Sequence, residues 1–217
     1  MVPPSRMVTA SVGGPTYRIG IWLEYILKTV ANKYCEGELV RDTPDFLGKI
    51  LQNNFEDLSK KKLVAMDICA LYPSIKIEIA IESALKKLSN YTETIVSRIV
   101  ELTKYWLKSS VLKFKETWYK SIEGVSTGGP ESSQVANILV KYVINEKILQ
   151  HSNLEEYNFL SNRSRFLDDI WGIWDSTETM FSEFLAKVNE IGSLYGITFT
   201  GECGISVVFL DVRTSIE

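Results

Sequence analysis

The sequence predicts an α+β fold, and three observations carry this prediction. Apolar residues recur at helical spacing in several segments, and short apolar runs typical of buried strands lie between these segments. Hydrophobic residues make up 45% and charged residues 24% of the 217 residues, which is ordinary for a folded globular chain. The chain is long enough to bury a core, as one large domain or two small ones.

The first third of the chain predicts two helices and one strand. Residues 15–33 form the first predicted helix, because their apolar side chains return every three or four positions. Thr43-Pro44 is a helix-start signal, and it predicts a shorter helix over residues 45–55. After a polar run, the apolar residues 63–66 predict a buried strand. The apolar positions of the first helix are Ile19, Trp22, Leu23, Ile26, Leu27 and Val30.

The rest of the chain alternates helices with short strands. An acidic pair at residues 168–169 separates two apolar runs, which predicts two strands joined by a turn. Leaving inserted helices aside, the order from residue 63 is β-α-β-β-α-β, the ferredoxin-like arrangement. In chain order the predicted elements are helices 77–88 and 92–107, a strand pair within 111–119, a glycine-rich loop 124–130, a helix 132–149, strands 165–167 and 170–174, a helix 181–194, and closing strands 197–200 and 206–212.

The cysteines and the single histidine exclude several kinds of site. Cys35, Cys69 and Cys203 are odd in number, widely spaced and without a CxxC pair, so neither a zinc site nor a disulfide framework is indicated. His151 is the only histidine, so a catalytic triad or a histidine-rich metal site would depend on it alone. The chemistry is therefore expected to come from carboxylates, lysine, arginine and tyrosine.

Apolar runs and termini give an expectation about location. No run is long enough to span a bilayer, and the N-terminal residues lack the apolar stretch of a signal peptide. We therefore expect a soluble intracellular protein without a membrane partner.

Charge along the chain is uneven. The formal net charge of −3 is not the basic footprint that is usual for a nucleic-acid-binding domain. Residues 104–120, however, hold five lysines against one acid, Glu116, and aromatic residues lie between them. Two interpretations stay open: a solvated helix face that runs into a hairpin, or a surface that contacts phosphates and bases. The aromatic residues are Tyr105, Trp106, Phe114, Trp118 and Tyr119.

Three aspartates carry the predicted chemistry. Asp67 follows the strand at 63–66, where a buried carboxylate is costly unless it is paired or bound to a metal. Asp168 and Asp169 are adjacent, and like charges this close repel unless a cation lies between them. In a βαββαβ sheet the first and third strands are central neighbours, so Asp67 and Asp168 are expected to meet and hold two metal ions. For Asp-Asp taken alone, an ordinary surface turn is the alternative.

The ligand set favours Mg²⁺, with Mn²⁺ as the second choice. Mg²⁺ prefers hard oxygen ligands, and keeps waters and phosphates in the rest of its coordination shell. Three aspartates without histidines suit this preference.

A glycine-rich loop precedes the predicted helix at 132–149. Glycines allow the backbone to approach a ligand closely, and a helix N-terminus favours anionic partners. The loop, residues 124–130, lacks the Gly-Lys-Ser/Thr ending of a P-loop, so NTPase chemistry is not indicated. It is equally consistent with a plain helix-start loop.

The order of these motifs resembles the palm of a reverse transcriptase. Asp67 is followed by Tyr72, then by the glycine loop and helix, and then by Phe166-Leu167-Asp168-Asp169. Further stretches are similar to the reverse-transcriptase domain of Penelope-like retroelements, and the resemblance covers nearly the whole chain. These stretches are Arg6-Met7-Val8, Gly14-Pro15-Thr16-Tyr17, Phe199-Thr200-Gly201-Glu202 and Phe209-Leu210-Asp211-Val212.

The resemblance implies an RNA-directed DNA polymerase domain, which adds dNTPs to a DNA primer on an RNA or DNA template. It implies a single domain with a palm, residues 61–88 and 121–217, and helical fingers-like elements, residues 1–60 and about 89–120. We expect neither a thumb nor an endonuclease among these residues, which fits one part of a longer polyprotein.

The resemblance also implies a role for each matching residue. Asp67 and Asp168 would ligate both Mg²⁺ ions, and Asp169 would be the supporting third acid. Tyr72 would pack against the sugar of the incoming dNTP and select against a 2′-hydroxyl, Arg6 would reach the triphosphate, and Ile68 would belong to the same dNTP site. Template and primer would contact Gly124, Gly128, Gly129, Pro130, Phe209 and Leu210, and residues 209–211 would form a turn that helps to position the primer.

Several positions depart from the family's pattern. Gly129 stands where a serine is usual, Glu131-Ser132-Ser133 replace Leu-Ser-Pro, Ser121 stands where a glutamine is common, and Phe166 replaces a tyrosine. Glu131 would bring a negative charge near DNA. The alternative function is therefore a truncated or domesticated, catalytically weak palm that binds nucleic acid or protein. A two-metal nuclease has no use for Tyr72 or Arg6, and an RNA-dependent RNA polymerase is disfavoured by the bulk of Tyr72, so both rank lower.

Overall fold

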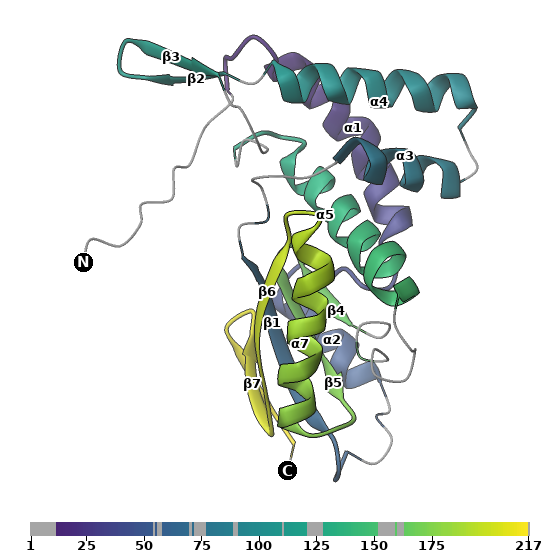
Figure 1. The fold of residues 1–217 in the computed structure, drawn as a ribbon, viewed down its shortest axis with the longest axis vertical. Helices are drawn as coiled ribbons and strands as arrows, with labels where there is room; N and C mark the ends of the chain where they lie inside the picture. Colours follow the sequence, from purple (N-terminus) through teal and green to yellow (C-terminus); the bar gives the residue numbers. More distant parts are fainter. Residues whose placement is uncertain are drawn as a thin grey trace. The chain divides into compact units, whose positions relative to one another are not determined.

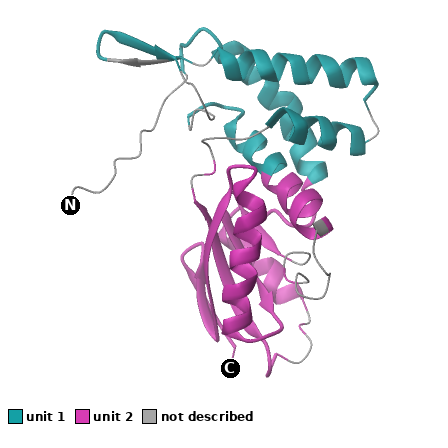
Figure 2. Ribbon diagram, in the orientation of Figure 1, with its two compact units in different colours: residues 1–34, 72–139 teal, residues 35–71, 140–217 magenta. Residues whose placement is uncertain are grey.

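The computed structural model describes residues 12–53, 55, 58–69, 71, 77–88, 91–109, 111–120, 128–151, 159 and 163–216. Arg6, Tyr72 and Gly124, which the sequence assigns to the site, lie outside these residues. The chain divides into two compact units, shown in Figure 2. Unit 1 is residues 1–34 and 72–139, and unit 2 is residues 35–71 and 140–217. No helix in the described ranges is long and apolar enough to cross a membrane.

Unit 1 is built mainly from helices (Figure 1). The first helix buries Leu23, Leu27 and Val30 along one face, which is the stripe that its sequence spacing predicts. Thr92 caps the longest of the later helices, because its side chain accepts a hydrogen bond from the backbone N–H of Ile95. The elements are α1 (Tyr17–Tyr34), α3 (Ile77–Lys87), α4 (Glu93–Lys108), the hairpin β2 (Val111–Phe114) and β3 (Thr117–Lys120), and the first part of α5 (Ser132–Tyr142).

Unit 2 contains a four-stranded antiparallel sheet in the order β4-β5-β1-β6. The first and third strands of the predicted β-α-β-β-α-β run, β1 and β5, are neighbours, so this part of the prediction is confirmed. The elements are α2 (Thr43–Gln52), β1 (Lys62–Cys69), a π-helical segment (Val143–Ile148), a 3₁₀ turn (Leu149–His151), β4 (Ser164–Phe166), β5 (Asp169–Trp174), α7 (Glu178–Ser193), β6 (Thr198–Gly204), and the hairpin β7 (Ser206–Phe209) and β8 (Val212–Ser215).

Helix α7 covers one face of the sheet. Phe181 and Phe184 of α7 pack against Trp174 of β5, with ring centroids 5.6 and 5.1 Å apart. Phe159 joins this cluster and lies against Gly172, where a side chain would collide with its ring. This face therefore buries an aromatic core between helix and sheet.

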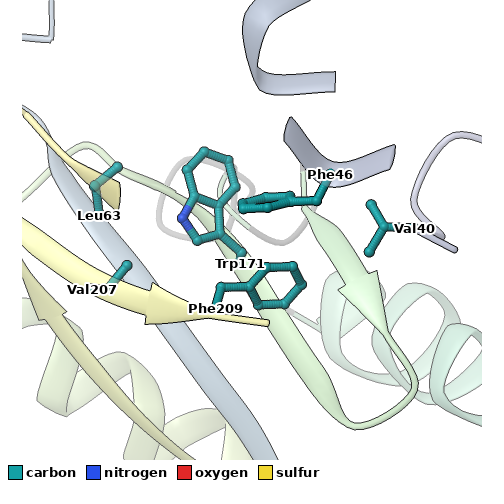
Figure 3. Packing of buried hydrophobic residues seen from close by; sticks show 6 residues of the cluster. All are labelled: Val40, Phe46, Leu63, Trp171, Val207 and Phe209. Carbon is teal, nitrogen blue, oxygen red and sulfur yellow. The ribbon is translucent and has the colours of Figure 1, made fainter. Parts of the chain in front are cut away.

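The opposite face carries a second cluster, the Trp171 cluster, which is shown in Figure 3. Trp171 of β5 packs against Phe46 of α2 with ring centroids 5.3 Å apart, and Phe46 packs against Phe209 of β7 at 4.6 Å. The indole Nε1 of Trp171 also donates a hydrogen bond to Thr214 Oγ1 at 3.1 Å. Helix α2 and the β7–β8 hairpin thus close this face. The buried members are Val40, Phe46, Leu63, Trp171, Val207 and Phe209.

Two predicted elements differ from the structure. The helix predicted as continuous over 132–149 is α-helical only to Tyr142 and continues in the wider π form, inside which Asn145 accepts a hydrogen bond from Arg163. The closing strand predicted at 206–212 is a strand only to Phe209: the chain then reverses, at the turn that the resemblance implies, to form the separate β7–β8 hairpin. Leu210 and Asp211 both have positive φ, which is the backbone of a two-residue hairpin turn.

Substitution of Gly192 tests how closely α7 approaches the chain that leads into β6. A Cβ at this position would lie 2.6 Å from the backbone oxygen of Ile197. Helix propensity alone predicts that Gly192→Ala stabilises by about 1 kcal/mol. We expect the opposite, a loss of roughly 1–3 kcal/mol in urea unfolding, because the backbone must shift. Ser193→Ala at the next, exposed position is the control, and a more stable Gly192→Ala protein would contradict the packing described here.

Candidate functional site

Two of the predicted aspartates lie directly opposite each other across the sheet. In the antiparallel pairing of β1 with β5, Asp67 is the partner of Asp169. Side chains of directly opposed residues point to the same face, with Cβ atoms typically about 5 Å apart. Ala65 and Trp171 form the neighbouring pair on this face. The two aspartates therefore lie next to Trp171 along the strands, on the face of the sheet that carries the Trp171 cluster.

Asp168 is held beside them by the turn between β4 and β5. Phe166 pairs with Asp169, so the turn consists of Leu167 and Asp168 only. The carbonyl of Asp168 accepts a hydrogen bond from the backbone N–H of Ile68 at 3.0 Å, which ties the turn to β1 one residue after Asp67. Leu167 has a φ of 51°, a left-handed conformation that is uncommon for leucine and costs on the order of 1 kcal/mol. The surrounding structure therefore enforces the position of this turn.

Electrostatics show that the acids act on one another. Burial raises the pKa of Asp169, and the negative charges of Asp168, Asp67 and Asp211 raise it further. Asp211 belongs to the β7–β8 turn, so a fourth acid from a separate hairpin approaches the same region. Mutual repulsion of this kind is relieved by protonation or by a bound cation.

The donor chemistry of these residues fits Mg²⁺. All four offer hard carboxylate oxygens, which Mg²⁺ prefers. In the described parts of the chain, no group of three or more histidine, cysteine, aspartate or glutamate side chains is already gathered around one point. Binding would therefore require the carboxylates to turn toward a shared ion, which the exposed position of Asp67 and the partial exposure of Asp168 and Asp169 allow.

A buried network of ion pairs is connected to the Leu167–Asp168 turn. The carboxylate of Glu38 accepts hydrogen bonds from Arg165 at 2.9 Å, from Lys141 at 3.0 Å and from Arg163. Arg163 also donates to Asn145 at 3.0 Å. The side chains of Glu38, Arg163 and Arg165 are 6%, 2% and 0% exposed. One carboxylate thus neutralises part of the charge of three cations inside unit 2.

Arg165 connects this network to the aspartate turn. Its Nη1 donates to the carbonyl of Leu167 at 2.9 Å, directly before Asp168. Its backbone N–H donates to the carbonyl of Glu38 at 2.8 Å, and its own carbonyl accepts from Val40. Burial would raise the pKa of Glu38, but the attraction of Arg163, Arg165 and Lys141 outweighs it and lowers that pKa. Sequence reasoning missed these residues, because Glu38 and Arg165 are separated by 127 positions.

The remaining predicted site residues lie in different parts of the structure. Ile68 is 1% exposed, so its side chain lies in the core and only its backbone reaches the Asp168 turn. Phe209 is a member of the Trp171 cluster, and the carbonyl of Leu210 accepts a hydrogen bond from Thr43 at 3.2 Å. Gly128, Gly129 and Pro130 belong to unit 1 and lead into α5.

Glu131 does not present its charge at the surface, contrary to the expectation of a charge near DNA. It is 0% exposed, and its oxygens lie where side chains at Gly20 and Gly129 would collide with them. Neither carboxylate oxygen has a hydrogen-bond partner among the described residues. Burial, with a smaller contribution from the charge of Glu24, raises the pKa of Glu131 to about 7.

A large cavity in unit 2 lies apart from the aspartates. It has a volume of about 900 Å³, and its lining includes Glu38, Lys141, Arg163, Trp171 and Trp174. Asp67, Asp168 and Asp169 do not line it. We therefore base the candidate site on the paired carboxylates and not on this cavity.

Comparison with known proteins defines the class of fold. No protein-family model and no curated protein matches the sequence. Solved structures do match, and they show that the chain has a reverse-transcriptase-like polymerase fold with helices and an antiparallel sheet.

Telomerases are among the matching structures. Apo telomerase from Candida tropicalis, truncated from its C-terminal domain, has a TM-score of 0.66 and 16% identity, covering 92% of this chain and 45% of that chain. Telomerase from Candida albicans, in complex with the TWJ fragment of telomeric RNA, has a TM-score of 0.62 and 14% identity, covering 93% and 37%. The chain thus spans less than half the length of these telomerases, and at such identity the likeness concerns the fold.

Proposed function

We propose that this chain is an RNA-directed DNA polymerase domain, which adds dNTPs to the 3′-hydroxyl of a primer. One observation carries the proposal. Asp67 and Asp169 are opposed across a sheet, with Asp168 in the adjoining turn, within a reverse-transcriptase-like fold. The proposal includes the finer assignments: a ferredoxin-like palm, which the strand order supports, and kinship with Penelope-like retroelements, which rests on the sequence motifs.

In this proposal Asp67 and Asp168 hold two Mg²⁺ ions and Asp169 supports them. The bound ions would lower the pKa of the primer hydroxyl and neutralise charge on the triphosphate. The protein's own contribution is to position the ligands. Arg165 and Glu38 fix the Leu167 carbonyl, and Ile68 fixes the Asp168 carbonyl, so the carboxylates start from a defined backbone.

The partners in this proposal are dNTPs and a template annealed to a DNA primer. Tyr72 and Arg6 are assigned to the dNTP, and Gly128, Gly129, Pro130, Phe209 and Leu210 to template and primer, on the strength of the sequence motifs. The fragment of telomeric RNA bound to one telomerase of similar fold supports an RNA partner.

Primer extension tests the proposal. We expect the protein to extend oligo(dT) on poly(rA) with dTTP and Mg²⁺ or Mn²⁺, and we expect Asp67→Asn and Asp168→Asn to abolish extension. Asp175→Asn is the matched control, because Asp175 is an exposed aspartate that pairs with Lys61 at 3.8 Å. Extension by the unaltered protein that does not exceed that of Asp168→Asn would refute polymerase activity for this chain.

A catalytically weak binding module is the second candidate. It is favoured because, among the described residues, no three or more histidine, cysteine, aspartate or glutamate side chains are already placed to hold one metal ion. Calorimetry separates the two functions, since a polymerase requires dNTP affinity that depends on Mg²⁺. A folded protein that binds an oligonucleotide but shows no such dNTP affinity would select the binding module.

A further inference from the structure

We propose that unit 1 carries a binding surface for single-stranded nucleic acid at the end of α4 and on the β2–β3 hairpin. This surface, called the basic aromatic surface, does not involve the aspartates and does not depend on their catalysing a reaction. Its members are Lys104, Tyr105 and Lys108 of α4 and Lys115, Trp118, Tyr119 and Lys120 of the hairpin.

Large aromatic side chains are exposed on this surface. Tyr105, Trp118 and Tyr119 are 59%, 61% and 49% exposed. All four residues of β3 are exposed, so this strand buries neither of its faces. Aromatic side chains have a large apolar area and flat faces on which other rings can stack.

The hairpin's geometry separates two aromatic positions. Successive side chains of a strand point to opposite faces, so Trp118 and Lys120 share one face and Tyr119 lies on the other. In the described part of the chain, β2 and β3 pair only with each other. A two-stranded hairpin is marginally stable by itself, and a base stacked on Trp118 with its phosphate near Lys120 would add contacts that stabilise it.

The charge of this surface selects a polyanion as its partner. Residues 104–120 contain five lysines and one acid, whereas the whole chain has a formal net charge of −3. Lys104, Lys108, Lys115 and Lys120 are all exposed. Lysines attract the phosphate backbone, and aromatic faces stack with unpaired bases. Together they fit a single strand, because the bases of a duplex are already stacked.

Fluorescence anisotropy with the full 217-residue protein tests this inference. The probes are labelled twelve-nucleotide oligo(U) and oligo(dT), and a duplex of the same length. We expect single strands to bind more tightly than the duplex. Trp118→Ala should weaken single-strand binding roughly tenfold or more, and Trp118→Phe should restore much of it, because stacking tolerates any aromatic ring. Tyr25→Ala, an 80% exposed tyrosine on α1, is the matched control.

The contribution of the lysines is measured by the salt dependence of binding. Each phosphate contact contributes about −0.7 to the slope of log K against log salt for a single strand. The double variant with Lys115→Gln and Lys120→Gln should therefore reduce the magnitude of that slope by about 1.4. Binding is measured without Mg²⁺ or dNTPs, so a protein that fails in primer extension can still bind through this surface, and the two failures are distinguishable.

Three results would overturn the inference. The first is an unchanged affinity in folded Trp118→Ala, the second is equal affinity for duplex and single strand, and the third is competition by poly-glutamate as effective as competition by oligo(U). The third result would assign the surface to an acidic protein segment.

Discussion

Replacing Glu38 with glutamine is expected to destabilise the protein by about 3–5 kcal/mol, because it leaves buried arginines without their counter-charge. Arg163 and Arg165 are 2% and 0% exposed, so neither can be solvated without opening unit 2. Burial already lowers the pKa of Arg163 to about 10 even though Glu38 attracts it. Since a domain of this kind is stable by only about 5–15 kcal/mol, much of that margin would be lost.

Urea unfolding followed by circular dichroism measures this loss. Glu82→Gln is the matched control, because Glu82 forms an exposed pair with Lys86 at 2.7 Å, and such pairs contribute at most about 1 kcal/mol. Arg165→Met is expected to reduce stability and also the proposed polymerase activity, because it removes the hydrogen bond to the Leu167 carbonyl beside Asp168. A loss for Glu38→Gln no larger than that of the control would show that the network does not hold unit 2 together.

Replacing Glu131 with glutamine is expected to stabilise the protein above neutral pH and to change little near pH 4. Burial raises the pKa of Glu131 from 4.5 to about 7 in the folded chain. Between these values the folded state keeps a proton that the unfolded state has lost, so stability falls as pH rises through this window and is constant above it. The loss is on the order of 3 kcal/mol.

Unfolding of both proteins at pH 4.5, 6 and 8 measures this effect as a difference. The difference between Glu131→Gln and the unaltered protein should grow with pH up to about 7, because glutamine does not titrate. Glu101→Gln is the control, since Glu101 pairs with Arg98 on the exposed side of α4. If the difference between Glu131→Gln and the unaltered protein stays constant across the three pH values, Glu131 ionises normally in the folded chain.

Much of the fold could be predicted because it depends on local patterns. The stripe of Leu23, Leu27 and Val30 places α1, and the apolar run that ends at Asp67 places β1. The neighbouring position of β1 and β5 followed from the order of elements, and it brings Asp67 opposite Asp169. The roles of these aspartates, of Tyr72 and of Arg6 stay predictions.

Other features could not be predicted because they depend on distant or unusual partners. Nothing near Glu38 in the sequence indicates that it meets Arg165, and the charges of both residues favour an exposed position. Leu210 and Asp211 form a turn that normally selects asparagine and glycine, so composition gave no signal for a hairpin there. Glu131 is buried although its type predicts exposure, and the charge of Asp211 acts on Asp169 from a hairpin whose second strand, β8, was not predicted.

During synthesis, β1 leaves the ribosome before either of the strands that pair with it. Strand β1 lies between β5 and β6, and the nearer of these partners in the chain, β5, begins at Asp169, 100 residues after β1 ends at Cys69. At translation rates of about 5–20 residues per second, β1 waits on the order of 5–20 s before β5 emerges. During this time its apolar residues Val64, Met66 and Ile68 have no sheet partner on either edge. The nascent chain is therefore open to aggregation or chaperone binding until the second half of unit 2 appears.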